Sequence, residues 1–92
     1  MNINPKFAVV ILTLANSLSA RGVPFTINIL WDGLQIKFPW NNGDIVCHSG
    51  SYGADNGYAE SAGCPWDDED VTMIDIDTAL HRIIDWYEET GE

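Results

Sequence analysis

Residues 25–40 have the sequence FTINILWDGLQIKFPW, which is the clearest local structural signal in the chain. Two alternating apolar and polar runs, 25–31 and 34–40, flank Asp32-Gly33, and Asp-Gly is a preferred two-residue turn of type I′. This turn would set the register of two antiparallel strands and bring four apolar pairs onto one face. The predicted pairs are Trp31 with Leu34, Ile29 with Ile36, Ile27 with Phe38, and Phe25 with Trp40. The sequence therefore predicts a hairpin with one face directed toward a core.

Two further turn signals extend this hairpin into a meander. Asn41-Asn42-Gly43 follows the second run, and Asp55-Asn56-Gly57 comes later. Asn-Gly sequences of this kind mark turns between strands. We expect a third strand over residues 45–51 and a short fourth strand over 58–62, which gives an antiparallel meander of three or four strands.

A helix is predicted before the hairpin, over residues 5–20. Asn4 can cap it, and Pro5 suits its first turn. Apolar residues recur at helical spacing, with Val9 and Leu12 broadening the stripe so that most of the helix is covered. These apolar residues are Phe7, Val10, Ile11, Leu14 and Leu18. The run 7–15 also has weak features of a signal peptide, but a buried helix is the favoured interpretation.

A second helix is predicted near the C-terminus, starting at Asp75 or Asp77 and ending at Gly91. Its predicted apolar stripe consists of Leu80, Ile83, Ile84 and Tyr87. A sheet with one apolar face must cover that face, and the two helices are the available cover. The predicted fold is α+β: a single domain over residues 1–92, built as a two-layer sandwich with both helices on one face of the meander.

The charge of the chain is unevenly distributed. Fourteen acids and four Lys or Arg residues give a formal net charge of −10. Residues 61–92 hold ten of these acids and a single base, Arg82. Such acidity excludes direct binding to nucleic acid and to anionic membranes, because phosphates would be repelled. We expect a local interaction surface for a basic protein partner instead.

The residues that could carry chemistry do not form a known pattern. Cys47, His48, Cys64 and His81 are zinc-ligand types, but no CxxC or HxxxH spacing joins them. Residues 67–70 offer oxygen ligands for calcium without the spacing of an EF-hand. We therefore expect no enzyme activity, no metal and no cofactor. Whether the two cysteines form a disulfide stays open at this point.

The acidic segments also carry aromatic residues that could anchor a partner, because Trp is a common interface residue. Complementary charge would speed association and make it sensitive to salt. The predicted partner-binding residues are Trp66, Asp67, Asp68, Glu69, Asp70, Asp85, Trp86, Glu88 and Glu89.

The chain resembles the small acidic proteins of phages and mobile elements, and in style the anti-CRISPR inhibitors of Cas9-type effectors. The resemblance rests on the Asp32-Gly33 hairpin, the acidic run 67–70, and the acids at 85, 88 and 89. The stretch HSGSYG, residues 48–53, is similar to a motif of small phage proteins. The resemblance implies a protein inhibitor in the host-cell cytoplasm that occupies a basic DNA-binding or PAM-reading site by DNA mimicry.

Three other classes of protein fit parts of the sequence. An immunity protein that neutralises a toxin nuclease would show the same acidity but have a different partner. A structural or assembly protein of a phage particle would self-associate. An enzyme or metalloprotein would depend on Cys47 or Cys64.

Overall fold

The computed structural model describes residues 2–68 and 70–90. The chain forms an N-terminal helix, a five-stranded sheet interrupted by one short 3-10 helix, and a C-terminal helix. The elements are α1 (Pro5–Ala20), β1 (Thr26–Leu30), β2 (Gly33–Lys37), β3 (Asp44–Cys47), η1 (Ala54–Asn56), β4 (Ala59–Ala62), β5 (Thr72–Ile74) and α2 (Ile76–Thr90).

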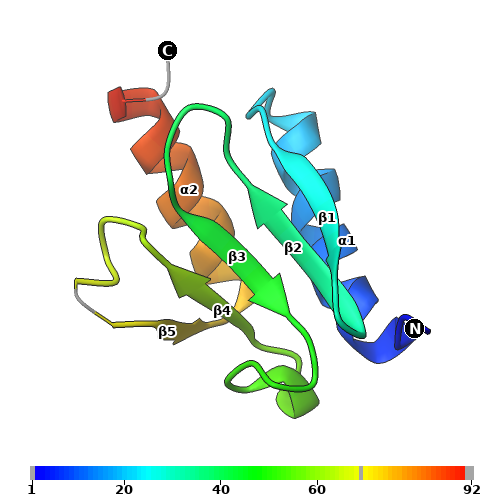
Figure 1. The fold of residues 1–92 in the computed structure, drawn as a ribbon. Coiled ribbons are helices and arrows are strands. Elements are labelled where there is room, and N and C mark those ends of the chain that lie inside the picture. Colours follow the sequence, from blue (N-terminus) through cyan, green and yellow to red (C-terminus); the bar gives the residue numbers. More distant parts are fainter. Residues whose placement is uncertain (1, 69, 91–92) are drawn as a thin grey trace.

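The sheet is an antiparallel meander in the order β1-β2-β3-β4-β5. Figure 1 shows both helices behind this sheet, so they form a second layer on one of its faces. The predicted two-layer α+β sandwich is confirmed. The sheet has a fifth strand beyond the three or four predicted, because the three residues of β5 are too few to form a visible alternation in the sequence.

α1 begins and ends where the sequence predicts. The Asn4 side chain accepts a hydrogen bond from the Lys6 backbone N–H at 3.0 Å, and Pro5 occupies the first turn. Beyond the helix, Gly22 adopts a left-handed φ of 74°, which glycine tolerates without strain. The predicted stripe is buried, but Val9 and Leu12 are exposed. The expectation that most of this helix is covered was wrong, because the sheet and α2 reach only one side of it.

The hairpin forms with a different turn and register from those predicted. Trp31 and Asp32 are the two turn residues, and Gly33 is the first residue of β2. Only Trp31 has a positive φ (55°), whereas a type I′ turn needs one at both positions. Ile29 pairs with Leu34, and Ile27 pairs with Ile36. The shift is two residues, so each residue of β1 and β2 keeps its predicted face, whereas Trp31 lies in the turn and not opposite Leu34.

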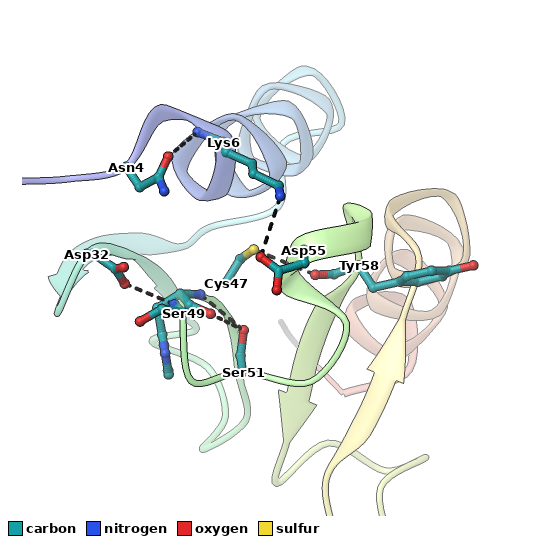
Figure 2. A network of polar contacts seen from close by, with 9 residues as sticks. Asn4, Lys6, Asp32, Cys47, Ser49, Ser51, Asp55 and Tyr58 are labelled. Carbon is teal, nitrogen blue, oxygen red and sulfur yellow. Dashed lines mark hydrogen bonds and ion pairs between the residues drawn. The ribbon is translucent and has the colours of Figure 1, made fainter.

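Gly33 explains the shift. A Cβ at this position would lie 1.8 Å from the Cys47 carbonyl oxygen, so the strand needs a residue without a side chain here. The glycine therefore permits a close approach of β3 and is not a turn residue. Asp32 fastens the hairpin end to the next turn, since its carboxylate accepts a hydrogen bond from the Ser49 backbone N–H at 2.9 Å (Figure 2).

β3 is shorter than predicted. It ends at Cys47, and residues 48–51 form a tight turn in which the Ser51 N–H donates to the His48 carbonyl at 3.0 Å. The Ser51 hydroxyl closes the same turn, because it accepts from the His48 N–H and donates to the His48 carbonyl. β4 starts one residue later than predicted.

The buried face of α2 differs from the predicted stripe. Asp75 is the cap, because its carboxylate accepts a hydrogen bond from the Thr78 N–H at 3.2 Å. Ala79, Ile83 and Trp86 are buried, whereas three members of the predicted stripe are only half-buried. These three are Leu80, Ile84 and Tyr87. The predicted end at Gly91 lies outside the described residues.

Candidate partner-binding surface

A set of exposed carboxylates surrounds the outer side of α2 and the loop that joins β4 to β5. We call this set the acidic surface, and its members are Asp68, Asp70, Asp77, Asp85, Glu88 and Glu89. Among the described residues the one ion pair is Lys6 with Asp55, which lies far from α2 along the chain. The described carboxylates of the acidic surface therefore have no cation within ion-pair distance. These negative charges repel one another, and a basic partner would reduce the repulsion.

A shallow hollow lies between the loop and α2, with a volume of about 290 Å³. Its walls combine aromatic rings with charged groups: Pro65, Trp66, Arg82, Asp85, Trp86 and Glu89. The Arg82 guanidinium lies 5.9 Å from the centre of the Trp66 ring, which is within range of a cation–π contact. The hollow thus brings together residues of the loop and of the helix, as the predicted surface requires.

Trp66 is held by a chain of hydrogen bonds. Its indole N–H donates to the Ser61 hydroxyl at 2.9 Å, and this hydroxyl donates to an Asp67 carboxylate oxygen at 2.7 Å. The second Asp67 oxygen accepts from the Cys64 backbone N–H at 2.9 Å. Ser61 is fully buried and Asp67 is only 4% exposed. These bonds fix the loop and orient the Trp66 ring toward α2.

Asp67 therefore differs from its predicted role as a surface carboxylate. It is buried and hydrogen-bonded, so it positions Trp66 and is not available to a partner. Its neighbours Asp68 and Asp70 are exposed, as predicted for partner-binding residues. Glu69 lies outside the described residues. An acidic run alone does not reveal which of its members turns inward, because that depends on the buried Ser61 hydroxyl across the loop.

Trp86 also differs from its predicted role. It is only 5% exposed and packs edge-on against three other rings. The ring centroids of Phe38, Trp40 and Trp66 lie 5.6, 4.6 and 5.7 Å from that of Trp86. Trp86 is thus a core residue that contributes to the wall of the hollow. The spacing of Ala79, Ile83 and Trp86 could have shown this, because i, i+4 and i+7 share one side of a helix.

Two residues of the hollow were not predicted. Arg82 and Pro65 line the hollow but are not among the predicted partner-binding residues. The helical spacing of Arg82, Asp85, Trp86 and Glu89 places these four side chains on one side of α2. This spacing is the signal that could have identified Arg82.

The cysteine and histidine residues lie in separate surroundings. Both cysteines are buried and free. Burial raises the pKa of the Cys47 thiol to about 11, and burial together with Asp67 raises the pKa of Cys64. His48 is tied to its own turn, where its Nδ1 accepts from the Gly50 N–H at 3.0 Å. In the part of the chain that the structure describes, no three His, Cys, Asp or Glu residues are grouped to hold a metal ion.

Comparison with known proteins finds no matching family model, no matching curated protein and no matching solved structure. Within the described residues, neither helix has the length and apolar character needed to cross a membrane. What the protein does must therefore be inferred from its own residues.

Proposed function

We propose that this protein is an inhibitor that binds a basic nucleic-acid-binding protein through the acidic surface and the Trp66 hollow. The observation that carries the proposal is the set of described carboxylates without ion-pair partners around an aromatic hollow. A groove that binds DNA is lined by Lys and Arg side chains, which contact phosphates. Carboxylates can pair with these same side chains and so exclude the nucleic acid.

The hollow adds a place for one side chain of the partner. Asp85 and Glu89 are one helical turn apart and lie beside the rings of Trp66 and Trp86. A Lys or Arg side chain that enters the hollow would pair with the carboxylates while its aliphatic stem contacts the rings. Aromatic anchors of this kind contribute much of the binding energy at protein interfaces.

The proposed target class is a Cas9-type effector, whose protein part reads the PAM and holds DNA in a positively charged channel. Binding there would block target recognition by DNA mimicry. Complementary charge predicts fast association that weakens as salt increases.

The test is a binding measurement with a catalytically inactive Cas9–guide complex at about 50 and about 200 mM salt. We expect binding that weakens at the higher salt and that a PAM-containing DNA duplex displaces. Failure of the duplex to compete would contradict DNA mimicry.

Variants locate the binding surface. Neutralising four exposed acids by Asp68→Asn, Asp85→Asn, Glu88→Gln and Glu89→Gln should reduce affinity about fourfold or more at low salt, since each exposed pair contributes about 0.2–1 kcal/mol. Glu89→Gln and Asp55→Asn form a matched pair, because each removes one exposed charge and only the first lies on the acidic surface. Unchanged affinity of the fourfold variant would overturn the proposal. Inhibition of a toxin nuclease without binding to the effector would identify an immunity protein.

A further inference from the structure

β1 leaves one side of its backbone without a strand partner. It is the first strand in the sheet order and pairs with β2 alone in residues 2–68 and 70–90. Leu30 and Gly33 close the two-residue turn, and hydrogen-bonded positions alternate along an antiparallel pair. Thr26, Asn28 and Leu30 thus direct their backbone groups toward β2. Ile27 and Ile29 direct theirs outward.

The side chains of this edge are apolar and exposed. Ile27 is 39% exposed and Ile29 is 69% exposed, although their partners Ile36 and Leu34 are buried. Opposed residues of an antiparallel pair project from the same face, so these two isoleucines extend the core face of the sheet. At these two isoleucines the core face of the sheet extends beyond the helices that cover the rest of it. Trp31, 60% exposed, adds an aromatic ring at the end of this strand.

Edge strands in soluble proteins are usually protected from pairing by charge, proline or shortness. Residues 26–30 have the sequence TINIL and contain neither a charged residue nor a proline. The opposite edge of the same sheet is protected. β5 has only three residues, and Asp70 and Asp75 lie close to its two ends. The exposed edge of β1 is thus a specific feature of one side of the molecule.

The sequence of β1 is matched to a second copy of itself. Ile27 and Ile29 are symmetric about Asn28, so a two-fold axis through Asn28 sets Ile27 of each copy opposite Ile29 of the other. These are the residues with outward backbone groups, so each pair can exchange two hydrogen bonds. The apolar side chains then meet on the same face. A contact of this kind is closed and self-complementary.

The distribution of charge also favours a second copy at this edge. Lys6, Arg21 and Lys37 are three of the four bases in the chain, and they nearly balance the acids of residues 1–60. The excess negative charge lies in residues 61–92, toward β5 and α2. Two copies that meet at β1 therefore hold their acidic surfaces at opposite ends of the combined sheet. Mutual repulsion is small at that separation, because salt screens distant charges.

We propose that the protein forms a reversible dimer in which β1 pairs with β1 of a second copy, antiparallel and centred on Asn28. The two sheets then form one continuous sheet with all four helices on the same face. Two strands of five residues make a small contact compared with the about 800 Å² per partner of a standard stable interface. The dimer is accordingly weak and forms at high protein concentration.

The first test is sedimentation of the full chain from about 1 μM to about 1 mM protein. We expect the mass to rise from that of a monomer toward twice that value. Ile29→Lys should keep the protein monomeric throughout, because it places a charge on the exposed edge. Met73→Lys is the matched control, since Met73 is an exposed apolar residue on β5 and its change should leave the dimer intact. A monomeric native protein at every concentration, or an Ile29→Lys variant that dimerises normally, would overturn the proposal.

A cross-linking test checks the register independently of affinity. Asn28 would face Asn28 of the second copy as a non-hydrogen-bonded pair, where Cα atoms lie about 4.5 Å apart and a disulfide can form. Asn28→Cys should oxidise to a covalent dimer, whereas Thr26→Cys, which faces Leu30 of the second copy, should not. The native cysteines are buried and do not compete. Cross-linking by Thr26→Cys in place of Asn28→Cys would exclude the Asn28-centred register.

The Ile29→Lys variant leaves the acidic surface unchanged. Binding of this variant to the Cas9–guide complex therefore tests the proposed function separately from the dimer.

Discussion

The two edges of the sheet expose opposite chemistry. At the β1 edge the isoleucines at 27 and 29 lie in solvent, and the nearby charges are nearly balanced. On the β5 side the Trp86 side chain of α2 is buried, and six carboxylates of the loop and of α2 are exposed. In this small fold, an apolar side chain is therefore buried only where a helix packs over it, whatever its residue type. α2 covers the aromatic cluster, whereas the isoleucine side chains of β1 extend past the cover that α1 gives to β2.

The largest contrast should come from Trp86, which is buried in the aromatic cluster, and Trp31, which is exposed at the end of β1. Trp86→Ala should lower the free energy of unfolding by about 3–5 kcal/mol, because it leaves a cavity among three aromatic rings. Trp31→Ala should lower it by less than about 1 kcal/mol, since that ring is mostly exposed. Urea denaturation followed by far-UV circular dichroism measures both variants. Equal losses would mean that burial does not distinguish the two edges.

Two glycines, one at the start of β2 and one before β4, give a second, smaller contrast. Gly33→Ala should lower stability by about 3 kcal/mol, because the new methyl group would overlap the Cys47 carbonyl oxygen. Gly57→Ala meets no atom within 4 Å but adopts a φ of 82°, so it should lower stability by about 1 kcal/mol. The melting temperatures of the two variants compare the effect of steric overlap at position 33 with that of backbone strain at position 57. A milder effect at Gly33 would show that β2 and β3 can move apart.

Adjacent acids in the loop of the β5 side should behave differently. Asp67→Asn should lower the free energy of unfolding by about 1–3 kcal/mol, because it disturbs two buried hydrogen bonds to the carboxylate. Asp68→Asn should change it by less than about 0.5 kcal/mol, since Asp68 is exposed and asparagine tolerates its left-handed backbone. Near-UV circular dichroism should report a changed Trp66 environment in the first variant alone. Identical behaviour of the two variants would contradict the inward orientation of Asp67.

The smallest expected effect at neutral pH is the difference in reactivity between the thiols of Cys47 and Cys64. Both should react slowly with a thiol reagent in the folded state. Cys64 should react more slowly than Cys47, because Asp67 and Asp44 add to the effect of burial on its pKa. The folded-state pKa of Cys47 is raised from 9.0 to about 11, so its contribution to stability is present below pH 9 and is lost as pH rises toward 11. Mass spectrometry after timed labelling gives the two rates, and denaturation across this pH range gives the sign. Faster labelling of Cys64 would reverse the expected order.

The sequence predicts the local elements well and the tertiary contacts poorly. Asn4, Pro5 and Asp75 mark the helix starts, because caps act through hydrogen bonds within a few residues. Alternation assigns the correct face to the residues of β1 and β2 but not to Trp31, which lies in the turn. The predicted register of the hairpin is wrong because position 33 must be glycine. The β3 carbonyl that requires this glycine is distant in the sequence. The predicted exposure of Asp67 and of Trp86 is wrong for the same reason. Ser61 and the aromatic cluster, which bury these two residues, belong to other elements.

The order of the sheet has a consequence for folding kinetics. Each strand pairs with the next one along the chain, so the meander consists of contacts between near neighbours in sequence, which form quickly. α1 is different, because it packs on β2, β3 and the last element, α2. During synthesis its apolar side therefore stays uncovered until the strands emerge, and Trp40 stays uncovered until α2 is complete. Packing of the C-terminal helix is thus the step that completes the core.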